Sequence, residues 1–335
     1  MLMFVTRRLV AIVPVLLILS VVAFLFVRAL PGDPATAILG PNASPESVAR
    51  LRDSLGLTAP PLQQYWHYLA GLSRGDLGVS AVSQRPIAED IANRLPATAE
   101  LAITAIVVAA PVGLAVGRLA ARRVSSTLDA ATTTATIAVV SIPVFVLGLM
   151  LQYVFAVHLG WLPAIGRASN PELIDSRTGF LLIDTVIAGD GYGFVDGLCH
   201  LVLPVATLAA MPVAVIARVS RAAYLGQAGS PHVRIAAAKG ITRRAVERHH
   251  ISRNSLPPVV VVTGLQFGAL LAGSIITENI FGWGGLGSLI VSAIRNRDYP
   301  VIQSALLVLA VIYVLVNLAV DIVNARLDPR LRAAT

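Results

Sequence analysis

Six long stretches of this chain contain no aspartate, glutamate, lysine or arginine, and they limit its possible folds more than any other feature. A helix needs about 20 consecutive apolar residues to cross a hydrocarbon core of about 30 Å, and each stretch reaches or approaches that length. They therefore predict an all-α integral membrane protein with six transmembrane helices. The stretches are Leu9–Val27, Leu101–Gly117, Ala130–Val157, Leu198–Ala217, Ser255–Thr277 and Tyr299–Val320. Pro143 is expected to kink the third of them.

The composition agrees with a membrane location. Charged residues make up 13% of the 335 residues, whereas a soluble domain contains about 25%. Arg7 and Arg8 before the first apolar stretch also resemble the start of a signal peptide, but the stretch exceeds the usual apolar region of about 7–15 residues. An uncleaved membrane anchor is therefore favoured. The single cysteine, Cys199, excludes a disulfide framework within the chain.

The basic residues collect on one side of the predicted membrane. The side with both termini carries 16 basic and four acidic residues, and the opposite side carries 10 basic and 14 acidic residues. Because loops rich in Lys and Arg stay in the cytoplasm, both termini are expected to be cytoplasmic. The charges lie in loops between apolar spans, which argues against nucleic-acid binding despite the net charge of +8.

The first external segment, residues 30–95, is expected to be a helical insertion. Ser44-Pro45-Glu46 is typical of a helix start and predicts a helix over 44–56, and Pro60-Pro61 predicts a second over 60–72. Aromatic residues follow the second helix, and we expect them to pack this segment or lie at the lipid headgroups rather than contact a ligand. They are Tyr65, Trp66 and Tyr68.

Two apolar spans carry pairs of glycines four residues apart. These are Gly113 with Gly117 and Gly264 with Gly268. Small residues at this spacing let helices approach closely in lipid. The pattern is compatible with packing inside the chain and with packing against a partner subunit.

The loop between the fourth and fifth spans carries the strongest functional signal. Within residues 218–255, hereafter the basic loop, the segment Arg234-Ile235-Ala236-Ala237-Ala238-Lys239-Gly240 combines alanines that favour a narrow helix with a glycine able to end it at positive φ. Such a helix can dock into a groove of another protein. It can also lie on the lipid headgroups, helped by Arg243 and Arg244.

Motifs for energy-yielding chemistry are missing from the chain. A phosphate-binding loop needs lysine in Gly-Lys-[Ser/Thr], and the only lysine, Lys239, is followed by glycine. The six stretches hold no Asp, Glu, Lys or Arg, the charged residues that ion-coupled transporters generally keep within the membrane, so we expect an external partner to supply the energy. A stand-alone channel, or an intramembrane hydrolase using Ser274, is the alternative from another class.

The chain resembles the membrane subunits of bacterial ABC importers of the dipeptide/oligopeptide/nickel permease family. The resemblance covers nearly the whole length and rests on the order and spacing of short motifs around the six spans. These are Pro31-Gly32-Asp33-Pro34, Arg74-Gly75-Asp76-Leu77-Gly78, Leu95-Pro96-Ala97-Thr98, Ser141-Ile142-Pro143, Leu159-Gly160-Trp161-Leu162-Pro163, Glu278, Phe281, Trp283, Gly285-Leu286-Gly287, Asn296-Arg297-Asp298-Tyr299-Pro300 and Asp328-Pro329-Arg330.

The resemblance implies a multi-subunit importer in the bacterial cytoplasmic membrane. Its other members would be a homologous second permease, two ATP-binding subunits and an extracytoplasmic substrate-binding protein. The chain itself would be no enzyme and would hold no cofactor, with ATP and Mg bound in the partner subunits. The substrate would be a short peptide, with nickel, an opine or another small solute as alternatives.

The resemblance also assigns the basic loop to coupling with the ATPase. Gly240 and Ala236 occupy positions of the family's loop motif, while Arg234 stands where importer permeases generally have glutamate. The implied coupling residues are Arg234, Ala236, Ala237, Ala238, Lys239, Gly240, Arg253 and Asn254. Uncharged polar residues within the spans are candidates for lining the translocation path, although each could instead bond a neighbouring helix. They are Gln152, Thr207, Gln266 and Asn317.

The expected organisation has four parts. Residues 1–29 form the N-terminus and first span, and 30–95 form the external insertion. Residues 96–325 form the permease core, including the basic loop, and 326–335 form a cytoplasmic tail.

Overall fold

A computed structural model describes residues 2–29, 34–40, 43–54 and 56–327 of the chain. Over these residues the regular elements are helices, with one isolated antiparallel bridge between Val79 and Pro86. The all-α prediction is confirmed for this part of the chain. Three features expected from the sequence lie partly or wholly outside the described residues: Pro31-Gly32-Asp33, Asp328-Pro329-Arg330 and most of the tail 326–335.

Five long helices form the body of the molecule. They are α1 (Leu2–Ala29), α5 (Ile87–Arg122), α9 (Gly191–Ala228), α12 (Leu256–Ile280) and α14 (Tyr299–Leu327). Length and composition qualify α5, α9 and the Tyr299–Val323 part of α14 as membrane spans, and two bent helix pairs raise the number to as many as five. The first predicted stretch falls within α1, whose Ile12–Leu25 segment is apolar but shorter.

The third predicted span is broken rather than kinked. It consists of α6 (Thr127–Ser141), α7 (Val144–Leu151) and a π-helix, η1 (Gln152–His158), and the two halves meet at 102°. Pro143 lacks an N–H donor and disfavours helical geometry in the residue before it, and Ile142 accordingly has ψ 124°. The predicted bend is in the right place, but it is far larger than a kink.

Three short helices follow α1 at one end of the molecule: α2 (Pro34–Leu39), α3 (Pro45–Ser54) and α4 (Pro61–Ser73). The sequence predicted α3 and α4 but not α2. Ser44 Oγ caps α3 by accepting from the Ser47 N–H at 3.2 Å. The aromatic residues of α4 pack on α1, with the Tyr65 and Phe24 ring centroids 5.2 Å apart, which confirms packing for Tyr65 and Tyr68, while Trp66 is exposed. The permease helix α5 begins at Ile87, inside the segment 30–95 expected to be the insertion.

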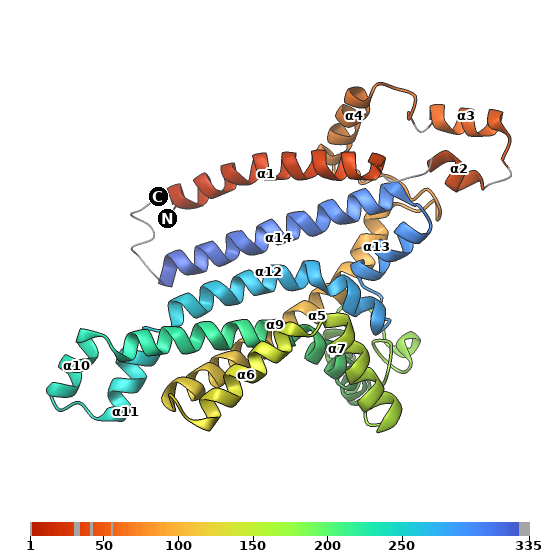
Figure 1. Cartoon of the computed structure of the whole chain (residues 1–335). Helices are drawn as coiled ribbons and strands as arrows, with labels where there is room; N and C mark the ends of the chain where they lie inside the picture. Colours follow the sequence, from red (N-terminus) through yellow and green to blue (C-terminus); the bar gives the residue numbers. More distant parts are fainter. Residues whose placement is uncertain (1, 30–33, 41–42, 55, 328–335) are drawn as a thin grey trace.

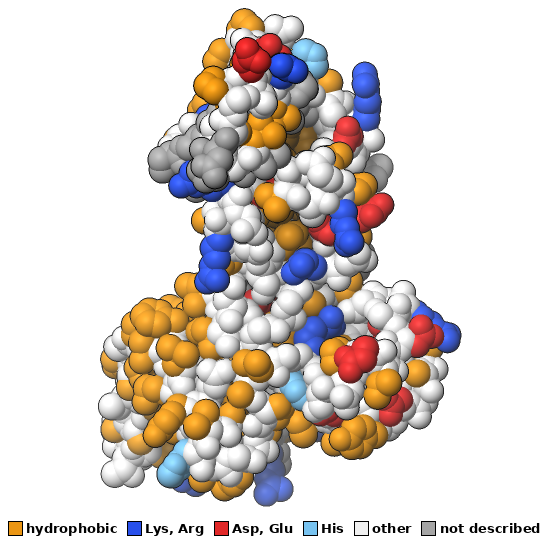
Figure 2. Space-filling model, turned by 90° about the vertical axis from the view of Figure 1, so that its right-hand side faces the viewer, with side chains coloured by type: hydrophobic (Ala, Val, Ile, Leu, Met, Phe, Trp, Pro, Cys, Tyr) orange, Lys and Arg blue, Asp and Glu red, His pale blue; other side chains and the backbone are white. Residues whose placement is uncertain are grey.

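The remaining elements lie at the two ends of the long helices. At one end, α10 (Pro231–Ala238), α11 (Arg243–Ala245) and the π-helix η3 (Val246–Ser252) lie toward the start of α1 and the end of α14 (Figure 1). The opposite end carries α2–α4 and α13 (Leu286–Arg295), and on it acidic and basic side chains are mixed (Figure 2). The elements η2 (Pro171–Leu173) and α8 (Leu181–Ala188) precede α9.

The glycine pairs serve close packing inside the chain. A Cβ atom on Gly117 would lie 2.3 Å from the backbone oxygen of Ala217 on α9. One on Gly264 would lie 2.3 Å from the Val320 side chain on α14. Both distances are shorter than any real contact, so each pair permits a tight helix crossing, as small residues do in membranes. This structure thereby selects packing within the chain over packing against a partner.

Candidate functional site

The basic loop folds around a small hydrophobic core of its own. Val233 and Ala236 from α10 and Val246 and Ile251 from η3 are buried together. They pack against Ala121 and Tyr224, which belong to the ends of α5 and α9. The loop is therefore a compact unit fixed to two long helices.

Helix α10 ends as the sequence predicts. Gly240 has φ +78°, the Gly240 N–H donates to Ala237 O at 3.0 Å, and the Ile241 N–H donates to Ala236 O at 3.3 Å. These two bonds and the left-handed glycine form a Schellman motif. The helix itself runs from Pro231 to Ala238, three residues longer at its start than the alanine-centred segment suggested.

Seven of the eight predicted coupling residues are exposed on this unit. Ala236 is the exception, because it is 5% exposed and faces the small core. Ile235 adds an apolar side chain that is 57% exposed, and Asn254 Nδ2 lies 3.4 Å from His232 Nε2, which brings the end of the segment next to α10. The exposed residues are Arg234, Ala237, Ala238, Lys239, Gly240, Arg253 and Asn254.

The exposed charge of this unit is positive. Its one acidic residue, Glu247, forms an ion pair with Arg122 at the end of α5. Seven cations make no ion pair with any residue of the described chain: Arg218, Arg234, Lys239, Arg243, Arg244, Arg248 and Arg253. The surface around Ile235 and Ala237 is thus a small apolar area within a basic field.

Ionic and polar contacts fasten this end of the molecule to the long helices. Arg221 on α9 holds Asp129 with two parallel bonds of 2.7 and 2.8 Å, the bidentate geometry of the strongest such pairs. Asp129 also accepts from the Ser125 N–H at 3.2 Å. Arg118 on α5 donates to Ser252 O at 3.3 Å. These contacts join the basic loop to α5 and join α9, which leads into the loop, to α6.

The four candidate path residues lie on four different elements. Thr207 is 1% exposed, and its hydroxyl donates to the backbone of its own helix at 2.8 Å. Gln152 donates to Ala164 O at 2.9 Å and so ties η1 to the following loop. Gln266 and Asn317 are half-buried on α12 and α14. Thr207 and Gln152 thus have structural bonds, and the path role of all four stays a prediction.

A buried carboxyl group lies at the end of α12, where the sequence indicated only a motif residue. Glu278 is fully buried. Its Oε1 accepts from Thr98 Oγ1 at 2.7 Å and from Ser274 Oγ at 3.0 Å. Its Oε2 accepts from the backbone N–H groups of Gly287 and Ser288 at 2.8 and 3.3 Å. Glu278 thus joins α5, α12 and the start of α13, and Ser274, the candidate nucleophile, is engaged with it.

The glycines of the nearby Gly285-Leu286-Gly287 motif make room for this carboxyl group. A Cβ atom on Gly285 would lie 2.6 Å from Glu278 Oε2, and one on Gly287 would lie 2.9 Å from the same oxygen. Trp283 is 1% exposed and donates from Nε1 to Ala97 O at 2.8 Å. Motifs separated by 180 residues and more therefore form one structural unit.

Other motifs of the resemblance also meet in space. Asp298 is 5% exposed and accepts from Ser80 Oγ and from the Ala81 N–H, and Ser304 donates to Leu77 O at 2.8 Å. The segment after α4 is thereby tied to the turn between α13 and α14. This contact fixes the arrangement of the end that carries α2–α4.

A second buried acid, Glu100 on α5, organises the segment before α9. It accepts from Arg167 Nη2 at 2.6 Å and from the Leu182 N–H at 2.9 Å. Asp184 on α8 is buried nearby. Burial alone raises the pKa of Asp184, but hydrogen bonds from the side chain and backbone of Thr178 and the backbone of Gly179 hold the pKa below its usual value. The segment is thus held by charged hydrogen bonds rather than by apolar packing alone.

Neither acid falls within a charge-free stretch of the sequence. Each lies at the edge of a span, where its charge ends the stretch. The helices extend beyond those stretches, and α5 and α12 contain Glu100 and Glu278. The six stretches themselves are free of Asp, Glu, Lys and Arg, but the helices that contain them hold buried acids just beyond the ends of the stretches. A glutamate directly beside a long apolar run is the signal that would have found them.

Comparison with known proteins agrees with this architecture. Residues 113–333 match the family model described as "Binding-protein-dependent transport system inner membrane component", and residues 1–102 match the companion model for the N-terminal part of such components. The chain is 42% identical over 336 residues to the dipeptide transport system permease protein DppB of Escherichia coli K12, covering 99% of both chains.

Two further relatives show the same full-length similarity. The dipeptide transport system permease protein DppB of Alkalihalophilus pseudofirmus is 42% identical over 332 residues, covering 99% of this chain and 100% of that protein. The glutathione transport system permease protein GsiC of Escherichia coli K12 is 40% identical over 332 residues, covering 99% of both chains. Together with the helical architecture and the two family matches, these similarities show that the chain belongs to the family of inner membrane components of binding-protein-dependent transport systems.

Proposed function

We propose that this chain is the ABC importer subunit that forms, with a second homologous permease, the membrane path for short peptides. An extracytoplasmic binding protein delivers the peptide, and two separate subunits bind ATP and Mg and hydrolyse the ATP. The full-length identity of 40–42% to two dipeptide permeases and a glutathione permease carries this proposal. All three relatives are named for peptides of two or three residues, which favours a peptide over nickel or an opine.

The basic loop is the element that we assign to docking on the ATPase. Three observations support docking over a position on lipid headgroups. The α10 surface is narrow, Ile235 is 57% exposed, and the unit is braced against α5 and α9. A rigid unit transmits motion from a partner to the membrane helices, whereas a helix resting on lipid needs no such brace.

The topology that we propose has six spans, with α1 as the first, α2–α4 outside and both termini inside. Two observations support this topology. The helix α10, the start of α1 and the end of α14 lie at the same end of the molecule (Figure 1), and this end carries the excess of basic residues. In a background with Cys199→Ala, we expect Arg244→Cys to react with a membrane-impermeant thiol reagent only from the cytoplasmic side. Thr58→Cys should react only from outside, and labelling of both from the same side would contradict the topology.

Substrate and energy source are tested together in proteoliposomes. The complete importer, with its binding protein, is expected to accumulate a labelled dipeptide when ATP is supplied on the ATPase side. Collapse of the proton gradient should leave this uptake intact. Uptake by the permease alone under an imposed pH gradient would contradict the ATP-driven mechanism. Competition by nickel or an opine, but by no dipeptide or tripeptide, would contradict the peptide assignment.

Glu278 does not weaken the ATP-driven mechanism. Its carboxyl group accepts four hydrogen bonds from neighbouring groups and is fully buried. A proton relay needs a group that exchanges protons with a water-filled cavity. The observed contacts instead give Glu278 a structural role.

A further inference from the structure

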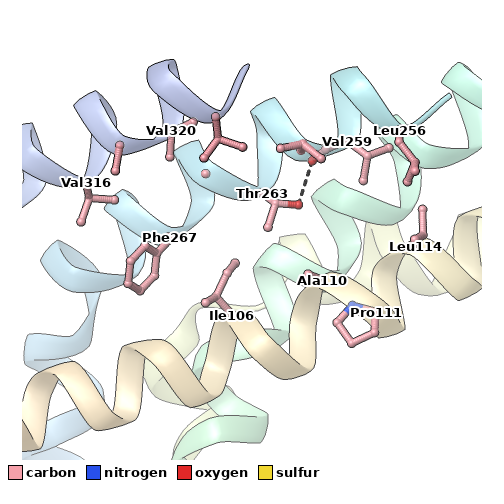
Figure 3. Close-up of a pocket in the computed structure, with 14 residues that line it drawn as sticks. Ile106, Ala110, Pro111, Leu114, Leu256, Val259, Thr263, Phe267, Val316 and Val320 are labelled. Atoms are coloured by element: carbon pink, nitrogen blue, oxygen red, sulfur yellow. Dashed lines mark hydrogen bonds between the residues drawn. The ribbon is translucent and has the colours of Figure 1, made fainter. Parts of the chain in front are cut away.

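We propose that an apolar groove between α5, α12 and α14 binds an acyl chain of an anionic phospholipid, whose phosphate lies at Arg118. The groove has a volume of about 590 Å³ (Figure 3). It lies within the spans, on the side of the membrane that carries the basic loop. Its lining includes no residue of α10 and none of the four candidate path residues, so the proposal does not rest on either of those assignments.

The lining of the groove suits a hydrocarbon chain. Its one polar side chain is Thr263, whose hydroxyl donates to Val259 O at 2.7 Å and is therefore satisfied. The other lining residues are apolar, and their side chains come from all three helices (Figure 3). They include Ile106 and Leu114 on α5, Phe267 on α12, and Val316 and Val320 on α14.

Small residues create the space. A Cβ atom on Gly264 of α12 would lie 2.3 Å from the Val320 side chain on α14. Because glycine has no side chain, α12 and α14 pack closely and form one wall of the groove. On α5, Ala110 and Pro111 face the groove. A short side chain on that side leaves a gap between the two walls that larger residues would fill.

The length of the groove matches an acyl chain. Its α12 lining runs from Leu256 to Phe267, which at about 1.5 Å per residue is about 16 Å, or half of a hydrocarbon core of about 30 Å. That is the depth of one leaflet, which a single acyl chain spans.

Arg118 lies at the mouth of the groove. It is one helical turn beyond Leu114 on α5, and its Nη2 donates to Ser252 O at 3.3 Å. Ser252 lies four residues before Leu256, the first lining residue on α12. The contact therefore joins α5 to the segment that leads into α12, at one end of the groove. The Arg118 Nε atom is buried and has no hydrogen-bond partner among the described residues. The guanidinium is therefore not saturated by protein groups.

Arg118 forms no ion pair among the described residues, so a phosphate at the mouth would pair with its charge through the outer nitrogens of the guanidinium. Arginine binds phosphate through two parallel N–H bonds, and basic pockets between membrane helices bind anionic lipid headgroups. An acyl chain in the groove and a phosphate at its mouth are the two parts of one molecule. This combination selects a phospholipid over a free anion or a neutral hydrocarbon.

The test uses the complete importer in bilayers of zwitterionic lipid. Phosphatidylglycerol and phosphatidylcholine, each with a photoactivatable group on an acyl chain, are added separately, and labelled peptides are identified by mass spectrometry. Phosphatidylglycerol is expected to label residues 106–114 or 256–267 about fivefold more than phosphatidylcholine does, as one cation near an anionic headgroup contributes about 1 kcal/mol. Arg118→Gln should abolish this preference, and Arg118→Lys should retain part of it.

Matched variants locate the effect. Ala110→Phe fills the groove and should reduce labelling by both lipids several-fold, whereas Ala115→Phe, on an exposed position of the same helix, should not. Arg123→Gln, which removes an exposed charge five residues away, should preserve the lipid preference. Equal labelling by the two lipids, or equal effects of Arg118→Gln and Arg123→Gln, would overturn the phosphate assignment. An unlabelled groove, with a cysteine at position 110 that cross-links to the second permease, would show that a protein helix covers it instead.

Discussion

Glu278→Ala is expected to lower the midpoint of thermal unfolding of the purified permease by on the order of 10 °C. The carboxyl group accepts hydrogen bonds from Thr98, Ser274, Gly287 and Ser288 in a site closed to solvent. Removing it leaves the Thr98 hydroxyl and the Gly287 N–H buried without an acceptor, whereas Ser274 keeps Leu271 O, and each such buried donor costs about 1–3 kcal/mol. The loss should separate α13 from α5 and α12, and it is measured by unfolding in detergent and by the amount of protein in the membrane.

Two variants make this prediction specific. Asn279→Ala changes the neighbouring residue, which is exposed and bonds only its own helix, and should leave the midpoint nearly unchanged. Glu278→Gln keeps one acceptor oxygen but replaces the other by a donor, so it should fall between alanine and the natural residue. A midpoint for Glu278→Ala equal to that of Asn279→Ala would refute the structural role of this carboxyl group.

Ala237→Glu and Gly240→Val are expected to abolish ATP-driven uptake while the permease remains in the membrane. Ala237 is exposed on α10, so glutamate there adds a bulky negative charge to the docking surface. Loss of a central contact weakens a protein interface by roughly 2 kcal/mol, or about 30-fold. Gly240 has φ +78°, a conformation that costs other residues about 1–2 kcal/mol and β-branched residues more. The measurement is uptake together with the amount of ATPase subunit that co-purifies with the permease.

The control for the docking surface is Ala222→Glu. Ala222 is also exposed, but it lies on α9 outside α10, so the same change in charge should leave uptake and association unaffected. Normal uptake by both Ala237→Glu and Gly240→Val would rule out α10 as the docking element. Equal loss in Ala222→Glu would mean that charge in the basic loop, rather than the α10 surface, is what matters.

The sequence predicted most reliably the features that depend on one or two neighbouring residues, such as the start or end of a helix. Helices α3 and α4 begin where Ser44 and Pro60 indicate, because a cap residue or a proline acts on the first turn alone. The end of α10 at Gly240 was predictable for the same reason. The break at Pro143 was predictable in position, whereas its angle of 102° depends on what each half packs against.

The site was predictable only in part. Exposure of Arg234 and Lys239 follows from their charge, but nothing in the spacing of the alanines shows that Ala236 faces inward, since its neighbours in the small core come from η3, α5 and α9. The candidate path residues were chosen for polarity alone. Polarity does not reveal that Thr207 bonds its own helix and that Gln152 bonds the following loop.

The sequence by itself determined the class of the protein, the approximate position of its apolar helices and the location of the basic loop. Water and hydrocarbon act on every residue separately, so length, apolarity and charge carry this information along the chain. Only the tertiary structure decided which distant groups meet: Glu278 with Thr98 and Gly287, Arg221 with Asp129, and the three walls of the apolar groove. A buried hydrogen bond or a close helix crossing depends on the distance between residues far apart in the chain, and that distance is set by the packing of the whole fold.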